Sequence, residues 1–278
     1  MTGTVWTRRA AGFGLLEAAR WYPGTGLLFS DMTRGGVYRL ADAGPEVVVP
    51  HRKAVGGLVA HADGGLVISG RNVAHKRDGT TTVLLETAPD EQFFNDITAD
   101  GAGRLYAGSM PADGARAGRL YRLGTDGRID VLADDVLASN GLAADPEDRT
   151  LLHVDSLRRV VWRFALDDPA VPREVFVDTA EYAGVPDGLA LARDGSVWVA
   201  MAGGGVVVGW GPDGRRIAEL AVPSALVTSV CFGGPDHDLL QVLTGVNDDY
   251  PDPDGGTVLQ APAPCAGLPG PLSRSYQH

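Results

Sequence analysis

A unit of four short apolar strands recurs six times along this chain of 278 residues. One copy begins at Asp187, turns at the pair Asp194-Gly195 and continues with the apolar residues 197–200. Repeats of about 40–50 residues with four strands each are typical of propeller blades. The sequence therefore predicts an all-β fold, a six-bladed β-propeller with four antiparallel strands per blade. The aligned first positions, separated by 39, 39, 45, 47 and 41 residues, are Glu17, Gly56, Asn95, Asn140, Asp187 and Thr228.

The repeats also predict how the chain is divided and closed. We expect one domain over residues 1–278, because dividing the set of blades would leave sheet faces unburied. Residues 4–7 precede the first full repeat and are expected to add the outer strand of the last blade, closing the ring. Residues 111–117 and 246–256 form long connections between the second and third strands of their repeats. Residues 263–278, rich in Pro and Gly, are expected to be an extended tail.

Charge and composition exclude several classes of partner. The chain has 24 Lys and Arg against 35 Asp and Glu, a net charge of −11, which argues against nucleic-acid binding and is compatible with a bound cation. No segment approaches the roughly 20 apolar residues of a membrane span, and no apolar run follows Arg8 and Arg9 as in a signal peptide. Cys231 and Cys265 lack metal-ligand spacing. We expect a cytoplasmic protein with unpaired thiols, and no feature indicates an obligate protein partner.

The first positions of the repeats predict a metal site. In a propeller the first strand of each blade lines the central channel, so equivalent positions form a ring at one mouth. Glu17, Asn95, Asn140 and Asp187 bring oxygen ligands to this ring, which suits a divalent cation, Ca²⁺ above all, with Zn²⁺, Mn²⁺ and Mg²⁺ as alternatives.

Each of these residues also has a simpler explanation. Asn140-Gly141 and Asp187-Gly188, taken singly, are common turn pairs, and Glu17 alone would be a surface residue. The shared register, which turn chemistry does not require, favours the site. Gly56 and Thr228 leave the ring incomplete and are expected to leave room for substrate.

Several stretches resemble the senescence-marker-protein/gluconolactonase/luciferin-regenerating-enzyme family, with diisopropyl fluorophosphatase as a more distant relative. The resemblance spans nearly the whole chain in the family's order. Its motifs lie at residues 16–21, 94–101, 104–110, 139–143, 154–156, 186–190, 195–200 and 228–234.

The resemblance implies a six-bladed propeller that hydrolyses lactones, or phosphoryl–fluoride bonds in the distant relative. It implies a divalent metal held by Glu17, Asn140 and Asp187, with Asn95 as a fourth ligand or a substrate contact.

One departure from the family concerns the substrate. Sugar-lactone members carry an arginine two residues before the Asn95 position, where this chain has Phe93. The resemblance implies further substrate contacts at Met110 and Asp113. Losing the arginine removes a fork of hydrogen-bond donors, so we expect a small-molecule substrate less polar than a sugar lactone.

These features together predict a divalent-metal-dependent hydrolase of a lactone or related ester. The cation would polarise the carbonyl, and Asp187 would act as general base or nucleophile. One alternative uses the same site for organophosphate-type hydrolysis or for a non-hydrolytic Lewis-acid step in a biosynthetic pathway. Another is a non-catalytic binding scaffold with a structural metal. His153, inside a predicted strand, is expected to be a packed or rim histidine.

Overall fold

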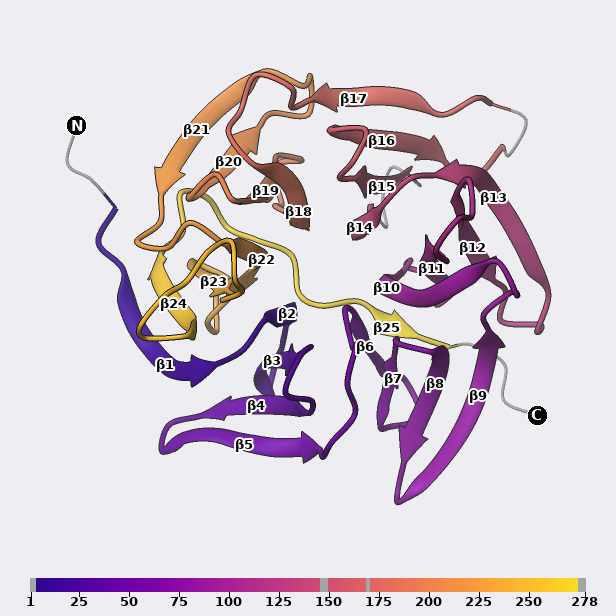
Figure 1. Ribbon diagram of the computed structural model, residues 1–278, viewed down its shortest axis with the longest axis horizontal. Helices are drawn as coiled ribbons and strands as arrows, with labels where there is room; N and C mark the ends of the chain where they lie inside the picture. Colours follow the sequence, from indigo (N-terminus) through magenta and orange to yellow (C-terminus); the bar gives the residue numbers. More distant parts are fainter. Residues whose placement is uncertain (1–3, 146–149, 169–170, 275–278) are drawn as a thin grey trace. The chain divides into compact units, whose positions relative to one another are not determined.

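The computed structural model describes residues 4–145, 150–168 and 171–274. Within these ranges the regular elements are 25 strands, which form five four-stranded sheets and one five-stranded sheet (Figure 1). The described residues contain no helix of the length and apolarity needed to cross a membrane. The predicted all-β, six-bladed propeller with four antiparallel strands per blade is confirmed.

Strand contacts divide the chain into two compact units, each with three of the sheets. Unit 1 comprises Met1–Lys53 and Thr179–Pro269, and unit 2 comprises Ala54–Asp178 and Gly270–His278. The expectation of one domain stays a prediction, and the units are described separately below.

Unit 1 contains three four-stranded sheets, each antiparallel throughout. The first sheet has the order β2 (Leu16–Tyr22), β3 (Gly26–Asp31), β4 (Val37–Ala41) and β5 (Gly44–Val49). The second has the order β18 (Val185–Leu191), β19 (Val197–Ala202), β20 (Val206–Trp210) and β21 (Arg216–Ala221). The third has the order β1 (Thr7–Phe13), β24 (Gly256–Pro262), β23 (Leu239–Thr244) and β22 (Val227–Gly233).

The N-terminal strand closes the last sheet, as predicted, but it begins later than expected. β1 starts at Thr7, which pairs with Gln260 of β24, whereas residues 4–7 had been expected to supply the strand. Trp6, whose apolar signal favoured the earlier start, instead donates its Nε1 hydrogen to the carbonyl of Ala221, 2.7 Å away.

Unit 2 contains the other three sheets. One has the order β25 (Leu272–Ser273), β6 (Leu58–His61), β7 (Leu66–Ile68), β8 (Asn72–Arg77) and β9 (Thr80–Glu86). The next has the order β10 (Glu91–Ala99), β11 (Leu105–Pro111), β12 (Gly118–Leu123) and β13 (Ile129–Val136). The last has the order β14 (Ser139–Asp145), β15 (Thr150–Asp155), β16 (Val160–Ala165) and β17 (Glu174–Asp178). The two predicted long connections do lie between second and third strands, from β11 to β12 and from β23 to β24.

The segment after β24 is hydrogen-bonded in both units. In unit 1 the amide of Arg193 donates to the carbonyl of Ala266 over 2.9 Å, and that of Gly267 donates to His237 over 2.8 Å. In unit 2, β25 pairs with β6 as a parallel fifth strand. This added strand was not expected, because a two-residue strand carries no periodic signal.

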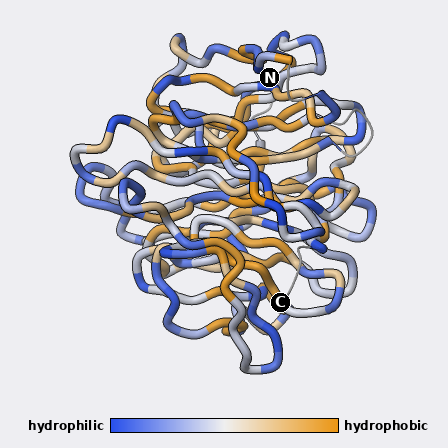
Figure 2. The backbone as a smooth tube through the Cα atoms, turned by 90° about the vertical axis from the view of Figure 1, so that its right-hand side faces the viewer, coloured by the Kyte–Doolittle hydropathy of each residue, from blue (hydrophilic) through white to orange (hydrophobic). Residues whose placement is uncertain are grey.

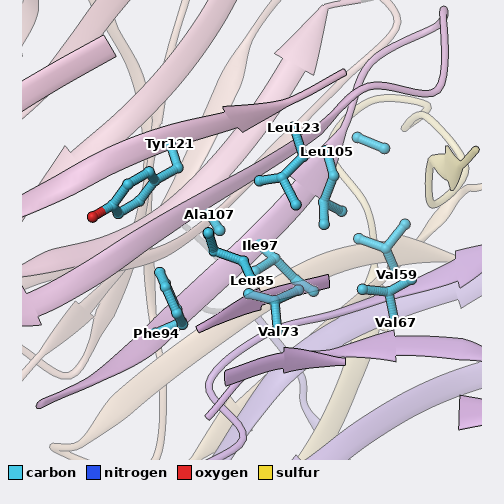
Figure 3. Close-up of a cluster of buried hydrophobic side chains, with 11 residues drawn as sticks. Val59, Val67, Val73, Leu85, Phe94, Ile97, Leu105, Ala107, Tyr121 and Leu123 are labelled. Atoms are coloured by element: carbon cyan, nitrogen blue, oxygen red, sulfur yellow. The ribbon is translucent and has the colours of Figure 1, made fainter. Parts of the chain in front are cut away.

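Alternation along the strands places cores between neighbouring sheets of each unit. On β11, Leu105 and Ala107 join a cluster with residues of β6–β10 and β12, which Figure 3 shows around Phe94 and Ile97. Tyr106, between them, joins a different cluster with residues of β12–β16. Figure 2 shows hydrophobic stretches of the backbone alternating with hydrophilic stretches. The middle strands are therefore buried on both faces.

Replacing Phe94 by alanine tests this core. Phe94 is fully buried, and its ring lies 5.8 Å from that of Tyr121 (Figure 3). We expect Phe94→Ala to lower the free energy of unfolding by about 3–5 kcal/mol in urea titrations, because it leaves a cavity. Half-buried Phe93 provides the control, and Phe93→Ala should cost about 1 kcal/mol or less. Equal losses for the two variants would contradict the assignment of Phe94 to the core.

Candidate functional site

In unit 2 the predicted site residues Asn95 and Asn140 lie within strands, at β-bulges. Phe94 of β10 pairs with Ser109 and Ile97 with Ala107, so three steps along β10 match two along β11. The extra residue falls in the segment that contains Asn95. β14 has the same irregularity between Ser139 and Leu142, around Asn140. A bulge takes a residue out of the ladder and redirects its side chain, which is a recurring device beside active sites.

Unit 1 has the same irregularity around Asp187 and directly after Glu17, which is itself paired with Ser30. Three steps along β2, from Glu17 to Arg20, match two along β3. Three steps along β18, from Pro186 to Leu189, match two along β19. Taken singly, Asp187-Gly188 had the simpler explanation of a turn pair, and the structure contradicts that explanation. The Asp-Gly pair lies inside β18, because the bulge accommodates it without ending the strand.

Backbone strain marks the bulge beside Glu17. Ala18 has a φ of 62°, in the left-handed region that an L-residue with a Cβ seldom adopts. Strain of this kind persists only where surrounding contacts hold it, and it concentrates at functional sites. One such contact is the amide of Ala19, which donates to Ser229 Oγ on β22 at 3.1 Å.

The two predicted carboxylates of unit 1 are buried. Glu17 is 7% exposed and Asp187 is 6% exposed. Acidic side chains are seldom buried this deeply unless they meet compensating charge or hydrogen bonds. Thr228, at the equivalent position of β22, has a different role, because its hydroxyl donates to the backbone carbonyl of Leu16 and lies 3.2 Å from that of Leu243.

The two carboxamides of unit 2 are hydrogen-bonded to each other. Asn95 Nδ2 donates to Asn140 Oδ1 at 2.9 Å and to the carbonyl of Ser139 at 2.9 Å. Asn140 Nδ2 donates to Ser156 Oγ at 3.0 Å. Asn95 Oδ1 is buried and accepts no hydrogen bond from the residues that the structure describes. A buried acceptor of this kind is costly unless a ligand uses it.

The structure corrects the expected role of Gly56. Room for substrate was expected beside this residue. Instead, a Cβ built on Gly56 would lie 1.9 Å from Asn95 Oδ1, so the Asn95 side chain fills that space.

The three predicted substrate contacts divide into a pair and a separate residue. Phe93 pairs with Met110 across β10 and β11, and both are half-buried. Asp113 is exposed in the connection after β11, where the amide of Ala115 donates to the carbonyl of Ala112 at 2.9 Å. The structure thus joins the two apolar contacts and leaves the acidic one at the surface.

Sequence reasoning missed the buried carboxylate that anchors the start of β10. Glu91 Oε1 accepts hydrogen bonds from Ser109 Oγ and Tyr121 Oη, both at 2.7 Å, and from Arg119 Nη1 at 3.0 Å. Burial acts to raise the pKa of Glu91, but these bonds and the one from the Ala88 amide lower it below its usual value. No spacing connects these residues in sequence, so only the sheet pairing reveals them.

Sequence reasoning predicted that His153 is packed or at the rim, but it did not identify the residue that His153 contacts. It is fully buried, as a packed histidine, and its Nε2 lies 2.9 Å from Ser139 Oγ. Burial, aided by the charge of Arg173 and opposed by Asp135, lowers its pKa from 6.5 to about 3. The imidazole is therefore neutral across the physiological range.

This lowered pKa predicts a pH-dependent component of stability. Below pH 6.5 the unfolded chain takes up a proton at His153 that the folded chain excludes, so this component is complete above 6.5 and falls as pH falls towards about 3. The loss is about 1.4 kcal/mol per pH unit, or about 2 kcal/mol between pH 6.5 and about 5. In urea titrations, the free energy of unfolding should decrease between pH 6.5 and about 5 in both proteins. The decrease should be smaller by about 2 kcal/mol in His153→Gln than in the wild-type protein. Equal decreases in the two proteins would show that His153 titrates normally when folded.

Comparisons with known proteins agree with this architecture. A model of the "SMP-30/Gluconolactonase/LRE-like region" family matches residues 15–246. The pentonolactonase XacC of Haloferax volcanii is 33% identical over 239 residues, covering 84% of this chain and 82% of that protein. The 6-deoxy-6-sulfogluconolactonase of Pseudomonas putida is 32% identical over 231 residues, covering 78% of each.

A solved structure extends the likeness to the fold of the whole chain. The calcium-binding protein regucalcin from Agrobacterium tumefaciens superposes with a TM-score of 0.85 over 97% of both chains. Its sequence is 23% identical, so this likeness concerns the fold alone.

Proposed function

The chain belongs to the SMP-30/gluconolactonase/LRE-like family, and from that premise we propose that it is a hydrolase of a lactone or a related ester. The observation that carries the proposal is a combination of two facts. Relatives at 33% and 32% identity are named as lactonases. This chain also keeps an oxygen-bearing side chain at the bulged first strand of four of its sheets.

We further propose that Glu17, Asn95, Asn140 and Asp187 hold a divalent cation. They lie on the bulged first strands of four sheets, two in each unit. Asn95, Asn140 and Asp187 lie inside the bulged segments, and Glu17 is the paired residue directly before its bulge. Their chemistry fits, because two buried carboxylates and two carboxamides form an all-oxygen set, and Asn95 Oδ1 is a buried acceptor that a cation would satisfy. Oxygen ligands favour Ca²⁺, with Mg²⁺, Mn²⁺ and Zn²⁺ as alternatives.

A cation bound there would supply Lewis-acid polarisation of the substrate carbonyl. Asp187 would take a proton from the attacking water as general base. The water oxygen then bonds to the carbonyl carbon, the ring C–O bond breaks, and the proton returns to the ring oxygen, giving a hydroxy acid. Asn95 and Asn140 would orient the substrate through their carboxamides, which their mutual hydrogen bond holds in place.

The Phe93–Met110 pair supports a substrate less polar than a sugar lactone. Phe93 lies two residues before Asn95 on β10 and pairs with Met110 on β11, and both side chains are half-buried. Such a surface gains from contact with hydrocarbon and offers no donors to hydroxyl groups. We propose that it contacts the apolar part of the substrate, whereas Asp113 is exposed in the connection after β11.

The alternative functions use the same residues differently. Organophosphate-type hydrolysis, or a non-hydrolytic Lewis-acid step, would keep the cation and change the substrate. A binding scaffold would need the cation for stability alone. The names of the relatives favour lactone hydrolysis, and the experiment below separates the three.

Lactone hydrolysis should depend on a divalent cation and on Asp187. We will find the activity, if the proposal is right, in a panel of aliphatic and aromatic lactones assayed with Ca²⁺, Mn²⁺, Mg²⁺ or Zn²⁺. We expect at least one lactone to be hydrolysed, and we expect a chelator to abolish its hydrolysis. Asp187→Asn should lower kcat by about 10²–10⁴, because it removes the general base.

A matched control is Asp213→Asn, an exposed aspartate in a turn of unit 1, which should leave kcat unchanged. Circular dichroism would establish that both variants fold. Absence of turnover with every lactone and cation would refute the hydrolase proposal, and turnover of a phosphoester instead would favour the first alternative. Full activity of Asp187→Asn would show that Asp187 is not the general base.

Substituting Phe93 tests the substrate assignment. Phe93→Arg adds a fork of donors where the apolar pair now lies. We expect the ratio of kcat/KM for a hydroxylated lactone to that for an aliphatic lactone to rise about tenfold. Gln92→Arg adds the same charge at the exposed neighbouring position and should leave the ratio unchanged. An unchanged ratio in Phe93→Arg would show that Phe93 does not contact the substrate.

A further inference from the structure

A buried serine–histidine pair is connected to the two carboxamides of unit 2. Ser139, on β14, precedes Asn140, and His153 lies on the adjacent strand β15. Both side chains belong to residues that are 0% exposed, and Ser139 Oγ lies 2.9 Å from His153 Nε2. Their complete burial excludes direct contact with a substrate.

The neighbouring strand is shaped to receive the serine hydroxyl. A Cβ built on Gly108 of β11 would lie 1.7 Å from Ser139 Oγ and 3.6 Å from His153 Nε2. Glycine at this position therefore makes the space that the hydroxyl occupies. The hydroxyl therefore lies close to both β11 and the imidazole.

Ser139 is linked to both carboxamides. Its carbonyl accepts the hydrogen bond from Asn95 Nδ2 at 2.9 Å, and its peptide bond leads to Asn140. A shift of the Ser139 backbone would therefore move the acceptor of Asn95 and the side chain of Asn140 together. Ser156 holds Asn140 from the other side through its own hydroxyl.

We propose that Ser139 and His153 are positioning residues that fix the Asn95–Asn140 pair. The imidazole can position Ser139 only through Nε2, because Nδ1 is buried without a hydrogen-bond partner among the described residues. The bond between Nε2 and the hydroxyl holds the Ser139 side chain, and through it the carbonyl and the following residue. Outer partners of this kind typically change metal affinity by about 10–100-fold when removed.

The proposal rests on the proposed function for its effect on cation binding, but its structural part can be tested without a cation. The variant His153→Phe keeps a ring of similar size and removes the hydrogen bond. His153→Gln places an amide near the position of Nε2 and keeps the bond. Tyr106→Phe is the control, because it removes one buried hydrogen bond, from Tyr106 Oη to Asp100 at 2.8 Å, in the same unit.

Two measurements give the result. In cation-free protein, NMR should show the side-chain amide protons of Asn95 exchanging with water about tenfold faster in His153→Phe. Calorimetric titration with Ca²⁺ should show affinity about 10–100-fold weaker in this variant. His153→Gln should restore both values to within about threefold, and Tyr106→Phe should leave both unchanged while lowering the melting temperature.

The outcomes separate this proposal from the proposed function. Unchanged Asn95 exchange in folded His153→Phe overturns the positioning role, whatever the cation does. If His153→Phe does not fold, Ser139→Ala takes its place with the same expectations. If the wild-type protein binds no divalent cation, the proposed metal site fails, and the exchange measurement alone supports or overturns the positioning role.

Discussion

Close contact between the first strands of neighbouring sheets is the constraint on which both units depend. In unit 1, a Cβ on Gly188 would lie 2.8 Å from Ser229 Cα, so β18 and β22 can approach this closely because residue 188 lacks a side chain. In unit 2, Gly56 admits Asn95 in the same way. This packing brings polar groups into the interior, where each needs a partner. Hydrogen bonds such as that between Ala19 and Ser229 meet this need and also fix the strands.

The bulges turn this packing into a site. A regular strand would direct alternate side chains into the two flanking cores, leaving no position for a polar group between them. The bulges of β10, β14 and β18 supply that position for Asn95, Asn140 and Asp187, and the bulge of β2 begins directly after Glu17. The left-handed Ala18 shows that the conformation is held at a cost. Rigid sheets on either side provide the support that such strain requires.

The fold was predictable because its signal repeats, whereas the local form of the site was not. Six copies of one pattern predicted six sheets of four strands, but not the added strand β25, and they aligned Glu17, Asn95, Asn140 and Asp187 as first positions of their repeats. A bulge has no period, so Asp187-Gly188 resembled a turn although it lies inside β18. The Glu91 network and the Ser139–His153 pair depend on strands that are distant in sequence. Their residues look unremarkable until the pairing is known, and the ligand role of the four aligned residues stays a prediction.

The pairing of β1 with β24 has a consequence for the order in which the protein assembles. The residues of unit 2, apart from its last short strand, are continuous from Ala54 to Asp178. Unit 1 combines residues before Ala54 with residues after Asp178, and Thr7 can pair with Gln260 only after β24 has been synthesised. During translation, the strands of unit 2 from β6 to β17 can therefore pair with one another while β1 still lacks its partner. β1, the first of the described strands in chain order, is thus among the last of them to be paired.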